Sequence, residues 1–162
     1  YHSALKKQMN IVDNIYDKVR NLSKDLNIKN KFSNNLEEIL DNLVEEMCSS
    51  FQNVEINIFP KEKLNNINDQ EFINAVSLTA KELITNIIKH AKAQNITLNL
   101  TAHKDSIILI ISDDGIGFNN NKYGLGLKNI NDRAILYEGE MSIDSSSKKG
   151  TSVTVKFLCN FD

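Results

Sequence analysis

The segment SDDGIGFNNNKYGLGLKNI, residues 112–130, holds four of the six glycines of this 162-residue chain. It opens with two carboxylates, Asp113 and Asp114, directly after the apolar run IILII. Its second glycine pair, Gly124 and Gly126, leads into a predicted helix, where backbone N–H groups can bind an anion such as phosphate. An acidic end and a phosphate-binding end together match a nucleotide whose base carries an amino group. A flexible Gly/Asn hairpin explains the same residues equally well.

A second candidate site is the segment ELITNIIKHAKA, residues 82–93. On a regular helix its polar residues would share one face, opposite the apolar face of Leu83, Ile84, Ile87 and Ile88; these polar residues are Glu82, Asn86, Lys89 and His90. An amide oxygen can bind Mg²⁺, a lysine can neutralise phosphate, and a glutamate can orient or deprotonate a nucleophile. A solvated helix face accounts for this segment when it is considered alone.

Other nucleotide and metal signatures do not occur in the chain. There is no G-x-G-x-x-G and no GK[ST], so neither a Rossmann fingerprint nor a P-loop is predicted. The two cysteines, Cys48 and Cys159, have no metal-ligand spacing and are predicted to be reduced thiols of a cytoplasmic protein. The net charge of -2 and the absence of a dense basic run argue against a nucleic-acid partner.

The elements that must position these residues follow from hydrophobic periodicity. Helices are predicted over 36–47, 71–91 and 127–138. Strands are predicted over 54–59, 96–102, 106–112, 139–144 and 151–158. This order predicts an α+β fold, a two-layer sandwich with helices on one face of a mixed, largely antiparallel sheet. The polar segment 61–70 is predicted to be a loop, and Asn34 with Glu37 to cap the first helix.

The first 26 residues contain no Gly or Pro and repeat apolar side chains nearly every three and four residues, from Leu5 to Leu26. This spacing predicts a long helix that packs on another helix, or else on its own domain. The polar segment 27–35 then predicts a boundary, with a helical part over 1–30 and a main domain over 31–162. Because the chain begins with Tyr1 rather than Met, we expect a fragment of a longer protein. We see no signal peptide and no apolar run that could span a membrane.

Taken together, the motifs resemble the ATP-binding domain of the GHKL (Bergerat-fold) superfamily, in that family's order. ELITNIIKHA resembles its N box, DDGIGF its G1 box, GLGLKNI its G2 box and GTSVTV its closing strand. The resemblance covers roughly residues 34–158 and is closest to sensor histidine kinases with a short lid. Residues 19–26, VRNLSKDL, resemble the end of the second helix of their dimerisation and phosphotransfer domain, a four-helix bundle made by two chains.

The resemblance implies a role for each motif residue. Asp113 would accept the adenine amino group, with Thr151 nearby through a water, and Glu82 would be the base or the residue that orients the nucleophile. Asn86 would hold Mg²⁺. The remaining implied ATP-binding residues are Lys89 and His90 near the phosphates, Gly115 and Gly117 beside the base, and Gly124, Gly126 and Leu127 at the lid hinge.

The chain departs from the family pattern at several positions. Ile87 stands where a small residue usually follows the N-box asparagine, only Gly139 remains of a usual Gly-Gly pair, and the lid is only NNNKY. The phosphoacceptor motif is missing, since His2 is followed by SALKKQ. The resemblance therefore implies an acceptor histidine upstream of Tyr1.

The predicted function is the ATP-binding catalytic region of a two-component sensor histidine kinase, an ATP-dependent phosphotransferase. It would pass the γ-phosphoryl of Mg²⁺–ATP to a histidine and then to an aspartate of a response regulator, within a homodimer formed through the N-terminal helix. We expect a cytoplasmic domain, in a parent protein that is either soluble or membrane-anchored. Two alternatives remain open: a serine protein kinase of the anti-sigma-factor type, and a non-catalytic interaction module with the same fold.

Overall fold

The structure of the protein is a computed structural model that describes residues 35–118 and 124–159. These residues belong to one compact unit, which begins at Asn34. The predictions of an N-terminal helix, of the linker up to residue 34 and of the short lid at 119–123 lie outside the described residues. In the described part, no helix has both the length and the apolar character needed to cross a membrane.

A five-stranded sheet forms one layer of the unit, in the order β1-β2-β3-β5-β4. Its strands are β1 (Asn53–Phe59), β2 (Asn95–Ala102), β3 (Ser106–Asp113), β4 (Glu140–Ser145) and β5 (Thr151–Leu158). The β1–β2 pair is parallel, and the other three pairs are antiparallel. A parallel pair needs a long crossover, which the helical segment between β1 and β2 supplies. The predicted mixed, largely antiparallel sheet is confirmed.

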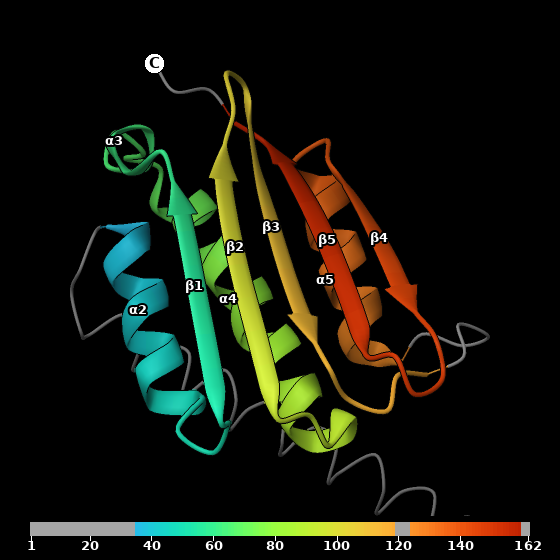
Figure 1. Cartoon of the computed structure of the whole chain (residues 1–162). Coiled ribbons are helices and arrows are strands. Elements are labelled where there is room, and N and C mark those ends of the chain that lie inside the picture. Colours follow the sequence, from blue (N-terminus) through green and yellow to red (C-terminus); the bar gives the residue numbers. More distant parts are fainter. Residues whose placement is uncertain (1–34, 119–123, 160–162) are drawn as a thin grey trace, which may run out of the picture. The chain divides into compact units, whose positions relative to one another are not determined.

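Helices form the second layer. They are α2 (Leu36–Met47), α3 (Lys61–Leu64), α4 (Gln70–Asn86), its continuation η1 (Ile87–Ala91) and α5 (Leu125–Leu136). Figure 1 shows α2, α4 and α5 side by side behind the sheet, α2 nearest β1 and α5 nearest β4. The face of the sheet toward the viewer carries no helix of the described residues. The two-layer α+β fold is therefore confirmed.

The core lies between these layers because side chains alternate along each strand. In β2 every second residue is buried, from Ile96 to Ala102, while the residues between them are half-buried. Phe157 of β5 is fully buried and makes edge-to-face contacts with Phe72 of α4 and with Tyr137, which follows α5. One aromatic cluster thus joins the sheet to both helices.

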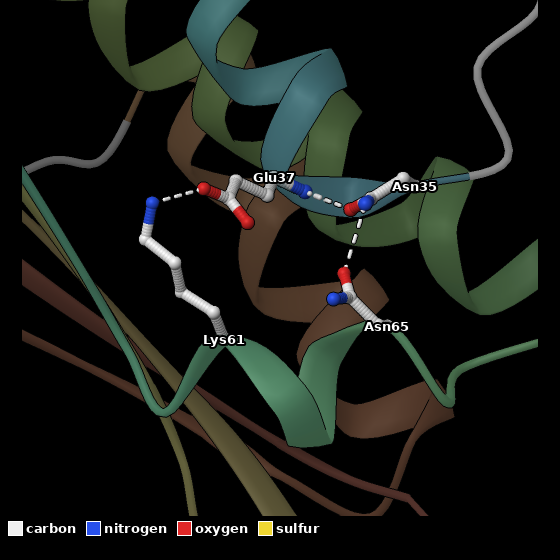
Figure 2. A network of polar contacts seen from close by, with 4 residues as sticks. All are labelled: Asn35, Glu37, Lys61 and Asn65. Atoms are coloured by element: carbon white, nitrogen blue, oxygen red, sulfur yellow. Dashed lines mark hydrogen bonds and ion pairs between the residues drawn. The ribbon is translucent and has the colours of Figure 1, made fainter.

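Two local predictions are wrong. The segment predicted to be a loop contains the short helix α3, because Leu64 and Ile67, three residues apart, are buried in the core. The residue that caps α2 is Asn35, whose side chain accepts the amide of Glu37 at 2.9 Å. Figure 2 shows that the same Asn35 also donates to Asn65 at 2.8 Å, while Lys61 pairs with Glu37. The start of α2 is thereby tied to α3.

Replacing the buried aromatic ring should cost far more stability than replacing an exposed one. We expect Phe157→Ala to lower the free energy of unfolding by about 3–5 kcal/mol, because it leaves a cavity in the core. Phe59, 73% exposed at the end of β1, is the matched control, and Phe59→Ala should change the free energy of unfolding by less than about 0.5 kcal/mol. Urea denaturation measures both, and equal losses would contradict this packing.

Candidate functional site

A cavity of about 350 Å³ opens where the helical layer meets one end of the sheet. It lies between the last turns of α4 and η1, the end of β3 with the loop after it, the start of α5 and the start of β5. Its lining residues are Leu83, Asn86, Ile87, His90, Ala91, Ile111, Asp113, Ile116, Gly117, Phe118, Gly124, Gly126, Leu127, Thr151 and Val153. A concave, mostly apolar site with a few polar groups is typical of a small-molecule pocket.

Asp113 is the half-buried carboxylate of this cavity. Its Oδ1 accepts the amide of Gly115 at 2.8 Å, and the amide of Thr151, its partner on β5, also donates to the carboxylate. Burial raises the pKa of Asp113, and the neighbouring charge of Asp114 adds to this effect. The two amides orient the group, and a carboxylate has capacity for about two further hydrogen bonds from a ligand.

Asp114, the next residue, has a different role. It is exposed and accepts the amides of Gln94 and Asn95, both at 2.9 Å, together with the side-chain amide of Asn95. These bonds, with the Asn95 amide as the largest contribution, lower the pKa of Asp114. The carboxylate ties the loop after β3 to the start of β2 and does not line the cavity.

The backbone of the loop after β3 needs glycine at its first two glycine positions, Gly115 and Gly117. A Cβ on Gly115 would overlap the carbonyl oxygen of Ala91, the residue that ends η1. That same oxygen accepts the amide of Ile116 at 2.8 Å. Gly117 has a φ of 62°, in the left-handed region that glycine tolerates best. The loop can therefore run directly against the helical layer.

The end of the long helix departs from regular α-helical geometry. Ile87–Ala91 form a π-helical turn, which holds more residues per turn than an α-helix. Asn86 and His90 consequently line the cavity beside Ile87, while Lys89 is exposed and does not. The prediction of one polar face shared by all four residues stays a prediction for Glu82 and Lys89, which do not line the cavity. Such turns often occur at functional sites.

The start of α5 closes the other side of the cavity. The Cα of Gly126 lies so close to Glu82 that an added Cβ would overlap its Oε1, and it would lie 3.5 Å from Nδ2 of Asn86. Gly124 is the N-cap and has no side chain with which to satisfy the first N–H groups of α5. An anion can use such groups.

The predicted site residues therefore gather at one place. Those that line the cavity are Asn86, His90, Asp113, Gly117, Gly124, Gly126, Leu127 and Thr151. Gly115 and Glu82 contact the elements that carry this lining, and Lys89 is exposed and is not a lining residue. Our predictions omitted most of the apolar wall, although the alternation of β3 and β5 places Ile111 and Val153 on the same face as Asp113 and Thr151.

The donor set can be compared with what a metal would need. Within residues 35–118 and 124–159, no cluster of three or more His, Cys, Asp or Glu side chains could hold an ion. Mg²⁺ commonly takes one or two protein oxygens and completes its shell with phosphate oxygens and waters. The amide oxygen of Asn86, on the cavity wall, fits that limited role.

This fold and cavity define a class of nucleotide-binding protein, and comparison with known proteins agrees. Residues 73–160, just over half of the chain, match the family of histidine kinase-, DNA gyrase B-, and HSP90-like ATPases. The chain belongs to this family.

Similar proteins include two sensor kinases and a solved structure. The chain is 36% identical over 93 residues to the signal transduction histidine-protein kinase/phosphatase DegS of Bacillus subtilis, covering 53% of this chain and 24% of that protein. It is 34% identical over 92 residues to the oxygen sensor histidine kinase NreB of Staphylococcus carnosus, covering 54% and 26%. The histidine kinase AdeS of Acinetobacter baumannii has the same fold, with a TM-score of 0.64, 16% identity and coverage of 96% and 84%. The chain spans about a quarter of the length of the two curated relatives.

The close approach of Gly115 to η1 can be tested by adding a methyl group. Gly115→Ala should lower the free energy of unfolding by about 1–3 kcal/mol, because the Cβ would overlap the Ala91 carbonyl and force the backbone to shift. Gly124→Ala is the control, since a Cβ there meets no atom of the described residues within 4 Å, and it should cost at most about 0.5–1 kcal/mol, because alanine is a poorer N-cap than glycine. Chemical denaturation would contradict the geometry if Gly115→Ala were harmless.

The bonds to Asp114 predict a specific pH dependence. Because its folded pKa lies below the unfolded value, the ionised carboxylate contributes stability above about pH 4, and this contribution is lost as the pH falls through the folded pKa. Asp114→Asn should therefore be less stable than the wild type at pH 7, and this deficit should shrink as the pH falls below about 4. Asp132→Asn, on the exposed side of α5, should follow the wild type throughout. Thermal melting across this range would contradict the assignment if the Asp114→Asn deficit were independent of pH.

Proposed function

We propose that this chain is the ATP-binding catalytic region of a two-component sensor histidine kinase. One observation carries the proposal: a half-buried carboxylate held by two backbone amides and the uncapped start of a helix border the same apolar cavity. A nucleotide has the complementary distribution of groups, with an amino donor on its base and negative charge on its phosphates. Family membership and the sensor-kinase relatives support the same assignment.

At the base end, Asp113 accepts the amino group of adenine, and Thr151 lies beside it on β5. Ile111 and Val153 supply flat apolar contacts from the sheet, and Ile87 supplies them from the helical layer. Ile87 is only 8% exposed, so its side chain forms part of this wall and limits the space there. The cavity volume suits a purine ring system.

At the phosphate end, the free N–H groups of α5 receive negative charge, and His90 lies on the same cavity wall. Asn86 contributes an oxygen to Mg²⁺, which supplies charge neutralisation for the transferred phosphoryl group. Glu82, packed under Gly126, orients this corner of the site and is the candidate base. Lys89 acts from the exposed turn as a cation near the phosphates.

The reaction is transfer of the γ-phosphoryl of ATP to a histidine, and then to an aspartate of a response-regulator receiver domain. The residues described here contribute positioning and electrostatic stabilisation rather than covalent chemistry. We further propose that residues 1–30 belong to the dimerisation helix, with residues 31–162 as the catalytic domain, and that the unit acts in the cytoplasm as part of a homodimer.

Calorimetric titration of the 162-residue chain with ADP and Mg²⁺ tests nucleotide binding. We expect saturable binding that Asp113→Asn weakens by about ten- to a hundredfold, because a charge-assisted hydrogen bond to the base is lost. Asp144→Asn, which removes an exposed carboxylate near the same end of the sheet, should leave the affinity unchanged.

No binding by the wild type would contradict the proposal and favour a non-catalytic module. For the transfer step, phosphate on the full-length parent protein should be acid-labile, as phosphohistidine is. Acid-stable phosphate on a partner protein would instead indicate a serine kinase.

A further inference from the structure

Ser145, the last residue of β4, is not among the residues assigned to the cavity above. It does not line the cavity, and it is half-buried. The strand register places it beside Thr151, which in turn pairs with Asp113. Directly opposed residues of neighbouring strands point to the same face, so Asp113, Thr151 and Ser145 form one row across the end of the sheet.

The hydroxyl of Ser145 holds two walls of the cavity at once. Its oxygen accepts the amide of Phe118 at 2.9 Å, in the loop that follows Gly117. It also lies 2.9 Å from the hydroxyl of Thr151 and 3.3 Å from the carbonyl oxygen of Gly150. Phe118 and Thr151 both line the cavity. One side chain therefore positions a loop residue and a strand residue that both line the cavity.

The arrangement also bears on which hydroxyl of the Ser145–Thr151 pair donates to the other. Ser145 has one hydroxyl proton to donate, and the amide of Phe118 already occupies an acceptor position on its oxygen. Either hydroxyl of the Ser145–Thr151 pair could be the donor, and the distances favour Ser145, since 2.9 Å is ordinary for an O–H···O bond whereas the 3.3 Å to Gly150 is long. In that arrangement Thr151 accepts from Ser145 and has its own proton available to donate into the cavity.

We propose that Ser145 is a positioning residue that makes Thr151 a hydrogen-bond donor beside the Asp113 acceptor, and so sets the preference for adenine. The base edge of adenine has an amino donor next to a ring-nitrogen acceptor, which matches this acceptor–donor pair. Hypoxanthine has the reverse pattern, a carbonyl acceptor next to an N–H donor. One water between Thr151 and the base preserves the pattern, because a water that accepts from Thr151 donates onward. The inference rests on the proposed nucleotide site.

The test compares ADP with inosine diphosphate, each titrated with Mg²⁺ into the 162-residue chain. Ser145→Ala should weaken ADP binding by about three- to tenfold, the range of one hydrogen bond, and inosine diphosphate binding by less than about twofold. The preference for ADP therefore falls. Ser145→Thr keeps the hydroxyl and should therefore show the wild-type preference for ADP. Ser142 is exposed on the other face of β4, so Ser142→Ala should match the wild type. In a Thr151→Val background, Ser145→Ala should no longer change the preference.

Each other result overturns the inference. Equal losses for both nucleotides would mean that Ser145 only supports the fold, and no loss would mean that it does not position Thr151; in both cases the proposed function stands. If the wild type binds neither nucleotide, the proposed function falls and the inference falls with it. If Ser145→Ala does not fold, Ser145→Cys, close to serine in size but a poor hydrogen-bonding group, is held to the same expectations.

Discussion

The hydrogen bond from the amide of Ile116 to the carbonyl oxygen of Ala91 joins the two layers where the cavity forms. Ala91 ends the π-helical turn, and Ile116 lies in the loop that leaves β3. The bond is possible only because Gly115 has no Cβ to meet that carbonyl. It holds the helical wall, with Asn86 and His90, opposite the carboxylate of Asp113.

Two adjacent carboxylates, chemically identical in the sequence, are separated in function by their surroundings. Asp113 is half-buried, and burial raises its pKa; two amides orient it toward the cavity. Asp114 is exposed, and its carboxylate accepts hydrogen bonds from the amides of Gln94 and Asn95 at the start of β2, which lower its pKa. The structural carboxylate keeps the loop in place, and the buried one is left to meet a ligand. Beside Asp113, the hydroxyl groups of Thr151 and Ser145 differ in the same way: Thr151 lines the cavity, and Ser145 holds Thr151 in place.

Much of the fold could be predicted because its signals are local. Alternating burial in β2 and the apolar periodicity of α4 are both legible in the residues themselves. The loop glycines also indicated a site, since their spacing matches close backbone approaches. The π-helical turn could not be predicted, because no propensity distinguishes IIKHA from an α-helix. Ser145 was missed for a different reason: its role depends on strand register and on the loop at Phe118, far away in the chain.

We propose that the base of a nucleotide occupies the cavity beside Asp113. The most direct test is a titration of the isotopically labelled chain with ADP and Mg²⁺, followed by amide chemical shifts. We expect the largest shifts at Asp113, Gly115 and Thr151 and in the turn from Asn86 to Ala91, while the open face of the sheet around Asn57 and Asn99 is unaffected. Shifts confined to that open face, or none at saturating ADP, would contradict it.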